Sequence, residues 1–224
     1  MQEILSAYYE KKFMIGKRLD DFTLFYSSPV SWFYSNNEMA LKPVTSDDNT
    51  RIFEELVFCI LTANTSAISG MKAVDSIRNV LSNGSIEDVK KGLIQTGYRF
   101  PNTRTTYIIE TRENFKDKDF KEIIQTYTPI ELREFFVQNV KGFGYKEASH
   151  FLRNIGIKGL AILDKHILRT LLEYKVIDEM PKTLNRKRYH ELENKLIDFS
   201  HQLKINIDEL DLLLWSMKTG NIMK

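Results

Sequence analysis

Apolar residues recur along most of the chain with the three-to-four-residue spacing of an amphipathic α-helix. The clearest stripe follows a polar run at 46–50 and joins Phe53, Leu56, Val57, Ile60 and Leu61. Period-two alternation of apolar and polar residues, the usual indication of a half-buried strand, is poor. The pattern predicts an all-α protein with roughly ten helices.

Capping residues mark the ends of several predicted helices. Thr128 is a good N-cap, Pro129 suits the first helical position, and Glu131 completes a capping box. Asn206 begins a similar pattern before a last helix, which we expect to stop at Gly220. These local signals support the helical interpretation of the apolar pattern.

The composition is that of a globular protein, with 42% hydrophobic and 28% charged residues in a chain of 224. This length suffices for one large domain or for two small ones that share a core. The net charge is only +2, so a nucleic-acid partner requires a local basic patch. Residues 140–175 supply one, because seven Lys or Arg and three acids give this segment a charge of +4.

Several classes of protein are excluded by the sequence. Cys59 is the only cysteine, so neither a disulfide framework nor a cysteine-based metal site can form within the chain. The four histidines lack tight ligand spacing, and we expect no metal ion and no cofactor. The N-terminus does not resemble a secretory signal, and no apolar run reaches the ~18 residues of a membrane span. We therefore expect an intracellular, cytoplasmic protein without a membrane partner.

A glycine-containing segment at 140–144 separates two predicted helices. Gly142 and Gly144 predict a tight turn that side chains would obstruct, and Val140 can fill the core beneath it. Backbone N–H groups exposed in this turn, next to a helix N-terminus, can bind a DNA phosphate. Taken alone, the pattern fits an ordinary helix–helix turn equally well.

Lys146 and Asp164 are the candidate reactive residues. Lys146 lies in the first turn of the second helix, near helix N-termini and other cations that favour its neutral, nucleophilic amine. Asp164 follows an apolar stretch, 160–163, at the start of another predicted helix. Considered separately, such an aspartate is more simply an N-cap and such a lysine a solvated surface residue.

Together, and after this hairpin, the two residues resemble the helix-hairpin-helix superfamily of DNA glycosylases. The superfamily pattern of Gly-x-Gly-x-Lys and Asp-x-His is present here as 142–146 and 164–166. Segments 58–65, 97–100 and 146–154, with the residues from Trp215 to Lys224, are similar to the archaeal-type 8-oxoguanine DNA glycosylase/lyase family. The resemblance runs from about Phe53 to the last residue and is weak over 1–50.

The resemblance implies a bifunctional enzyme of base excision repair that removes 8-oxoguanine from double-stranded DNA. Lys146 would attack C1′ of a flipped nucleotide, and Asp164 would stabilise the positive sugar and help to orient the lysine. The resulting Schiff base permits β-elimination, which nicks the strand. Val140, Gly142 and Gly144 would hold the DNA backbone.

The resemblance also implies a pocket for the damaged base. Phe100 and Trp215 would sandwich the base, and Lys224 would line the pocket because the tail at 221–224 turns back into it. On periodicity alone, Trp215 would be a core aromatic residue.

The expected architecture has two helical lobes, a helix-hairpin-helix motif and an active-site cleft between the lobes. Residues 50–158 would form a helical barrel that ends in the hairpin, and residues 1–49 with 159–224 would form the second lobe. We expect a monomer without the iron–sulfur cluster of the endonuclease III branch, because that cluster needs four cysteines.

Three alternatives stay open at this point. One is a bifunctional glycosylase for oxidised pyrimidines. Another is a non-catalytic helix-hairpin-helix DNA-binding module, which needs the glycines but neither Lys146 nor Asp164. The third is a helical scaffold with no DNA role, which leaves the charge of +4 in residues 140–175 unexplained.

Overall fold

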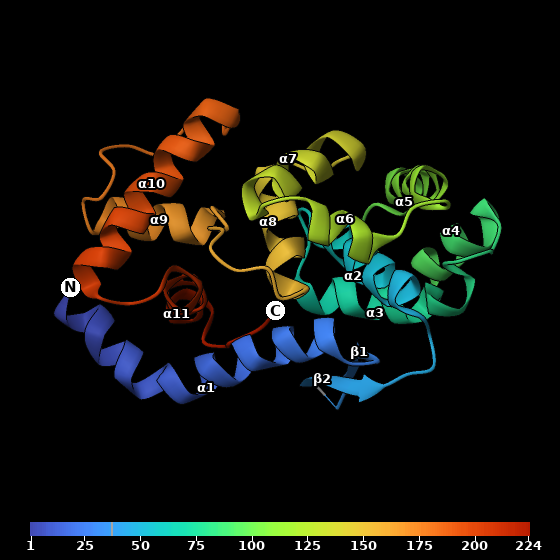
Figure 1. Ribbon diagram of the computed structural model, residues 1–224, viewed down its shortest axis with the longest axis horizontal. Helices are drawn as coiled ribbons and strands as arrows, with labels where there is room; N and C mark the ends of the chain where they lie inside the picture. Colours follow the sequence, from blue (N-terminus) through green and yellow to red (C-terminus); the bar gives the residue numbers. More distant parts are fainter. Residues whose placement is uncertain (37) are drawn as a thin grey trace.

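The computed structural model describes residues 1–36 and 38–224 and consists mainly of helices (Figure 1). Its eleven α-helices within these residues are α1 (Gln2–Ser27), α2 (Asp48–Thr62), α3 (Ala67–Ile77), α4 (Ile86–Gln95), α5 (Pro101–Phe115), α6 (Phe120–Thr126), α7 (Pro129–Asn139), α8 (Tyr145–Asn154), α9 (Lys165–Glu173), α10 (Arg186–Leu203) and α11 (Ile207–Thr219). One 3-10 turn, η1 (Arg78–Val80), follows α3. The predicted helical fold class is confirmed.

A small β-hairpin is the one departure from the all-α expectation in this part of the chain. Strands β1 (Val30–Ser35) and β2 (Glu38–Pro43) pair antiparallel, with Trp32 opposite Leu41. Trp32 is buried and packs against Phe22 of α1, with ring centroids 6.0 Å apart. Each strand has only six residues, so its alternation of apolar and polar residues is too short to stand out in the sequence.

The helices lie on two sides of α8 (Figure 1). Helices α9, α10 and α11 lie on one side and α2 to α7 on the other, while α1 runs along both groups. The first half of α1 packs along α11, where the Tyr8 hydroxyl donates to Glu209 at 2.9 Å. Strand β1 instead packs against α3. The lobe boundaries at 49/50 and 158/159 stay a prediction. The contact of α1 with α11 supports it, while β1, which the prediction assigns to the second lobe, packs against α2 and α3 of the other one.

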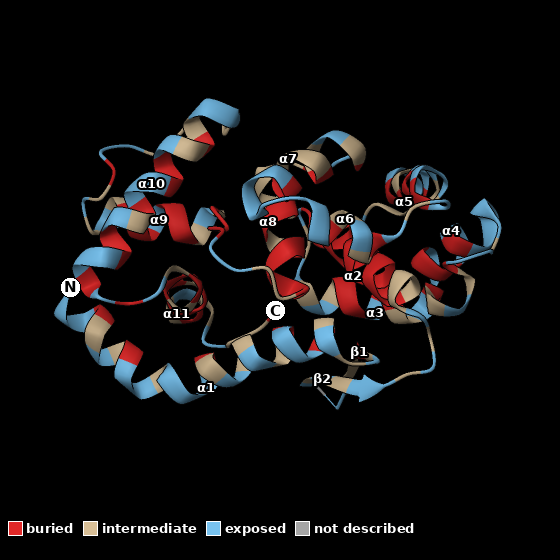
Figure 2. Cartoon of the chain, viewed as in Figure 1, coloured by how far each residue is buried: buried red, intermediate tan, exposed pale blue. Residues whose placement is uncertain are grey.

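Helix α2 is buried on all sides (Figure 2). Its apolar stripe predicts one buried face, yet every residue from Arg51 to Thr62 is buried because α3, α5, α6, α8 and β1 surround the helix. Its buried charged side chains, Arg51, Glu54 and Glu55, each have an ion-pair partner, although Nε of Arg51 has no hydrogen-bond partner among the described residues. Arg51 donates to backbone carbonyl oxygens of Phe25 and Val30, each at 2.8 Å. This central helix places its last residues, including Thr62, at the candidate site.

The predicted helix ends agree closely with the structure. Thr128 and Glu131 form the capping box of α7, and Pro129 is the first residue of that helix. Asn206 caps α11, which ends at Gly220 with a left-handed backbone. These boundaries depend on a few adjacent residues, which is why sequence alone could locate them.

The turn between α7 and α8 requires glycine at one of its two glycine positions. Gly142 has a φ of +84°, and a Cβ there would lie 2.5 Å from Cε2 of Tyr107. Gly144 has ordinary extended backbone, and a Cβ would approach only Oε2 of Glu147, at 3.3 Å. Val140 is buried beneath the turn, as expected. The expectation that side chains would obstruct the turn therefore holds for Gly142, whereas at Gly144 a Cβ requires only that the Glu147 carboxylate shift by a few tenths of an ångström.

Substituting each glycine with alanine should distinguish the left-handed position, Gly142, from the extended one, Gly144. Gly142→Ala should lower the free energy of unfolding by about 1–2 kcal/mol from the left-handed backbone alone, and further through the contact with Tyr107. Gly144→Ala should change it by less than about 0.5 kcal/mol. Urea unfolding of both variants measures the difference, and equal losses would contradict this account of the turn.

Candidate active site

Two cavities, of about 330 and about 540 Å³, meet at the N-terminal turns of α8 and α9. The residues that line both of them are Thr62, Thr65, Lys146, Asp164 and His166. Lys146 and Asp164, which are eighteen positions apart in the sequence, thus lie on a shared wall of the two cavities. The structure brings together the two residues that the sequence identified as reactive.

The position of Lys146 follows from the hairpin. Tyr145 begins α8 directly after the turn, so Lys146 lies in the first helical turn with 28% of its side chain exposed. Glu147 completes a cap on this helix, because its Oε2 accepts the N–H of Gly144 at 3.2 Å. Its other oxygen, Oε1, lies 3.6 Å from Nζ of Lys146. The amine is therefore accessible and has a carboxylate neighbour that sequence reasoning did not single out.

Asp164 is the N-cap of α9. Its Oδ1 accepts the backbone N–H groups of His166 and Ile167, each at 2.8 Å. Oδ2 accepts no hydrogen bond from any residue in the described part of the chain. The capping role therefore occupies only one oxygen of Asp164, and the other makes no hydrogen bond to a described residue.

The smaller cavity has the more apolar walls. Trp215 and Leu212 of α11 line it, together with Met223 and Lys224 from the segment that follows this helix. The resemblance places the tail in the pocket of Trp215, and Met223 and Lys224 do line the cavity that Trp215 lines. Of the three predicted base-pocket residues, the structure places Trp215 and Lys224 at this cavity.

The other predicted binding residues lie elsewhere. Phe100 does not line either cavity; it precedes α5, and the Arg99 guanidinium lies 4.9 Å from its ring centroid. Gly144 lines the larger cavity beside Lys146. Val140 and Gly142 line a separate groove next to the hairpin. The hairpin thus borders the candidate site through Gly144 alone.

The side chain of Lys224 is an anchor inside the protein. Its Nζ lies 2.5 Å from Oε2 of Glu55 and 3.8 Å from the ring centroid of Phe58, and the residue is 4% exposed. Asn154 of α8 donates to the other oxygen of Glu55 at 2.7 Å. Burial lowers the pKa of Lys224, an effect that Glu55 opposes. The ammonium therefore fixes the end of the tail against α2 and α8.

Sequence reasoning missed two titratable residues of the smaller cavity, His150 and Asp211. Burial, followed by the nearby cation of Arg153, holds the pKa of His150 well below its usual value, so its ring is neutral. Burial raises the pKa of Asp211 to about 6, although Nη1 of Arg153 lies 2.6 Å from its Oδ2. Helical spacing could have found both, because His150 follows Lys146 by four and Asp211 precedes Trp215 by four.

No cluster of three His, Cys, Asp or Glu side chains suited to a metal ion occurs within residues 1–36 and 38–224. In the same residues, no helix combines the length and the apolar character needed to cross a membrane.

Comparison with known protein sequences gives consistent matches. A family model described as 8-oxoguanine DNA glycosylase matches residues 37–205. The chain is similar to the 8-oxoguanine DNA glycosylase/AP lyase of Methanocaldococcus jannaschii, with 42% identity over 184 residues, 82% of this chain and 87% of that protein. It is 44% identical over 185 residues to the protein of the same name from Fusobacterium nucleatum, covering 79% of this chain and 83% of that one.

Solved structures resemble the whole chain. The 8-oxoguanine DNA glycosylase of Thermotoga maritima matches with a TM-score of 0.83 and 32% identity, covering 100% of this chain and 97% of that one. The Methanocaldococcus jannaschii 8-oxoguanine glycosylase/lyase in complex with 15mer DNA containing 8-oxoguanine gives 0.83 and 36%, covering 100% of both chains. With a family model that spans more than half of its length and relatives above 40% identity, this chain belongs to the 8-oxoguanine DNA glycosylase family.

Proposed function

We propose that this member of the family excises 8-oxoguanine from double-stranded DNA and then cleaves the strand, as a bifunctional DNA glycosylase/AP lyase. The observation that carries the proposal is the shared wall formed by Lys146 and Asp164 between two cavities. The smaller cavity, beside Trp215, suits an extruded base, and the larger one borders the hairpin at Gly144. A flipped nucleotide would then present its sugar to Lys146.

In this proposal, Lys146 is the nucleophile. Its neutral amine attacks C1′, the bond between C1′ and the base nitrogen breaks, and the base leaves. Loss of a proton and opening of the sugar ring give a Schiff base on Nζ. That imine acidifies the C2′ hydrogens, and removal of one of them expels the 3′ phosphate. A lysine at this position therefore accounts for lyase activity as well as base release.

Asp164 would supply negative charge where positive charge develops on the sugar. Its Oδ2 has no partner in the described residues, while Oδ1 is held by the N-terminus of α9. Because the capping contacts hold the carboxylate in place, little reorganisation is needed when the sugar becomes positive.

The base pocket of this proposal consists of Trp215, Phe100 and Lys224. The position of Trp215 in the smaller cavity supports stacking on the base, and Lys224 supports the pocket through its buried contact with Glu55. Phe100 lies outside both cavities, so its part in the sandwich rests on the family resemblance alone.

Phosphate contacts would come from the hairpin residues Val140, Gly142 and Gly144 and from exposed cations. The N–H of Gly144 already donates to Glu147, so a phosphate would have to displace that contact. In the charged segment 140–175, Lys141 and Arg153 are paired with acids. The exposed cations of this segment without an ion pair to any described residue are Lys158, Lys165, Arg169 and Lys175. These four are the more available for DNA phosphates.

We also propose an intracellular monomer without an iron–sulfur cluster. An intracellular location follows from a DNA substrate, and a single cysteine cannot supply the four thiolates of such a cluster. That the chain is of the archaeal type remains a proposal. The relatives from Fusobacterium nucleatum and Methanocaldococcus jannaschii are about equally similar to it, so sequence identity does not favour one source over the other.

Replacing Lys146 with glutamine should abolish borohydride trapping of the protein on duplex DNA that contains 8-oxoguanine, because an amide cannot form the imine. Affinity for undamaged duplex should change little. The matched control is Lys187→Gln, which removes an exposed lysine of α10 that lines neither cavity and should leave trapping intact. Normal trapping by the Lys146 variant would mean that another amine is the nucleophile.

Asp164→Asn tests the charge of the carboxylate separately from its capping role. Asparagine caps helices about as well as aspartate, so the free energy of unfolding should change by less than about 0.5 kcal/mol. The single-turnover rate of base release should fall by about 10²–10³-fold, because a charge that stabilises the transition state is lost. An unchanged rate of base release would instead indicate that Asp164 acts only as a cap, since asparagine preserves the cap.

Leucine at Trp215 should weaken lesion recognition. Loss of one stacking face corresponds to about 1–3 kcal/mol per base, so single-turnover excision should fall by about 10–100-fold at subsaturating enzyme while binding to undamaged duplex is retained. Phe100→Leu, measured in parallel, shows whether the second half of the predicted sandwich contributes. Excision from a duplex that contains thymine glycol, measured separately, tests the alternative of a glycosylase for oxidised pyrimidines. Unchanged excision by the Trp215 variant would place base recognition elsewhere.

A further inference from the structure

The segment from Gly159 to Asp164 reaches the active site without helix or strand hydrogen bonds of its own. Side chains of α10 and α11 accept four of its backbone N–H groups instead. The pairs are Gly159 with Asp208 at 3.0 Å, Ala161 with Glu193 at 3.1 Å, Ile162 with Asp211 at 3.3 Å, and Leu163 with Tyr189 at 3.2 Å. The placement of Asp164 therefore depends on these acceptors.

Tyr189 makes two of the contacts closest to Asp164. Its hydroxyl oxygen accepts the N–H of Leu163, and the hydroxyl donates to the carbonyl oxygen of Ala161 at 2.8 Å. Tyr189 is 1% exposed, and burial raises the pKa of its phenol, so the hydroxyl keeps the proton it donates. One side chain thus fixes two of the three residues that lead into Asp164.

The same side chain also touches the helix that carries Lys146. The ring centroids of Tyr189 and Tyr145 are 5.4 Å apart, and the Tyr189 hydroxyl lies 3.5 Å from Oγ of Ser149. Tyr145 directly precedes Lys146, and Ser149 follows it by three positions. Tyr189 therefore contacts both elements that bear the candidate reactive residues.

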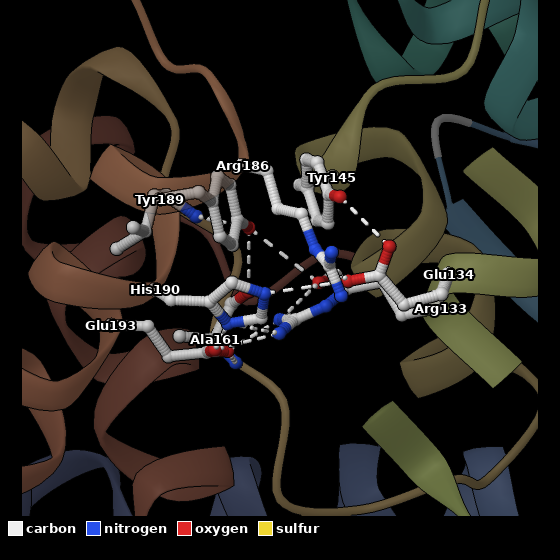
Figure 3. A network of polar contacts seen from close by, with 10 residues as sticks. Arg133, Glu134, Tyr145, Ala161, Arg186, Tyr189, His190 and Glu193 are labelled. Carbon is white, nitrogen blue, oxygen red and sulfur yellow. Dashed lines mark hydrogen bonds and ion pairs between the residues drawn. The ribbon is translucent and has the colours of Figure 1, made fainter. Parts of the chain in front are cut away.

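A buried ion pair holds Tyr189 and its helix in place. Arg133 of α7 makes two parallel bonds to Glu193, from Nη1 to Oε1 at 2.5 Å and from Nη2 to Oε2 at 2.7 Å (Figure 3). The Arg133 guanidinium also lies 5.2 Å from the centroid of the Tyr189 ring. Because Oε1 of Glu193 is the acceptor for Ala161 as well, α7, α10 and the Asp164 segment are joined at one point.

We propose that Tyr189 is a positioning residue that sets the carboxylate of Asp164 against the amine of Lys146 during base excision. The inference rests on the proposed roles of those two residues. Its physical basis is that catalysis by oriented groups is steep in distance, with about 10²-fold lost for a displacement of about 1 Å. Without the hydroxyl, Leu163 and Ala161 lose buried hydrogen bonds, and the segment can shift while Lys146 stays in place.

The test uses Tyr189→Phe, which keeps the ring against Tyr145 and Arg133 and removes only the hydroxyl. Single-turnover excision from 8-oxoguanine duplex should slow by about 10–100-fold, while the Kd for undamaged duplex stays within about twofold. The matched control is Tyr8→Phe, which also removes an interhelical tyrosine hydroxyl, one bonded to Glu209 between α1 and α11. The control should excise at the normal rate.

A double-mutant cycle with Asp164→Asn separates positioning from general destabilisation. If Tyr189 acts through Asp164, Tyr189→Phe should slow excision by less than about twofold in the Asp164→Asn background, with reactions sampled from seconds to days. The same slowing in both backgrounds, or none in the wild-type background, overturns the inference. If Asp164→Asn itself excises normally, the proposed role of Asp164 is what fails.

A second variant is used if Tyr189→Phe does not fold. Glu193→Gln keeps an amide oxygen that can accept the N–H of Ala161 and removes the charge paired with Arg133. It should slow excision and show the same loss of effect in the Asp164→Asn background. If Glu193→Gln and Asp164→Asn instead slow excision by factors that multiply in the double variant, the inference is overturned without any Tyr189 variant being needed.

Discussion

Buried carboxylates that accept backbone N–H groups determine where this site can form. The segment before α9 has no regular structure, and Glu193 and Asp211 are the acceptors that hold its middle. A buried carboxylate costs several kcal/mol unless it is paired. Arg133 of α7 and Arg153 of α8 provide those pairs at 2.5 and 2.6 Å. The two arginines therefore join the helices on both sides of the hairpin to the segment that ends at Asp164.

Helix α8 extends this organisation to the base cavity. Lys146, His150 and Asn154 are spaced four residues apart and so follow one face of the helix. The first two line the smaller cavity, and the third binds Glu55, which in turn holds Lys224. One face of α8 thus connects the turn at Gly142 with the Lys146 amine and, through Glu55, with Lys224 in the smaller cavity. A change in the hairpin would therefore alter the position of residues that line this cavity.

Sequence alone predicted the features that a few neighbouring residues control. The caps at Thr128 and Asn206 and the turn at Gly142 are of this kind. Lys146 and Asp164 are eighteen positions apart, and it was the family resemblance that placed them together. The β-hairpin, the all-round burial of α2 and the contact between Lys224 and Glu55 depend on segments far apart in the chain. No local pattern encodes such packing, so these features became visible only in three dimensions. The expected place of Phe100 came from family resemblance and is not seen at either cavity.

The buried end of Lys224 also limits how the tail can vary in evolution. Chain ends and surface loops usually accept insertions and deletions because nothing depends on their length. Here four residues lead from the left-handed turn at Gly220 to an ammonium group fixed 2.5 Å from Glu55. One added or missing residue moves the chain by up to about 3.8 Å, more than an ion pair tolerates. The spacing between the end of α11 and this lysine should therefore be free of gaps among relatives that share Glu55, even where the intervening side chains differ.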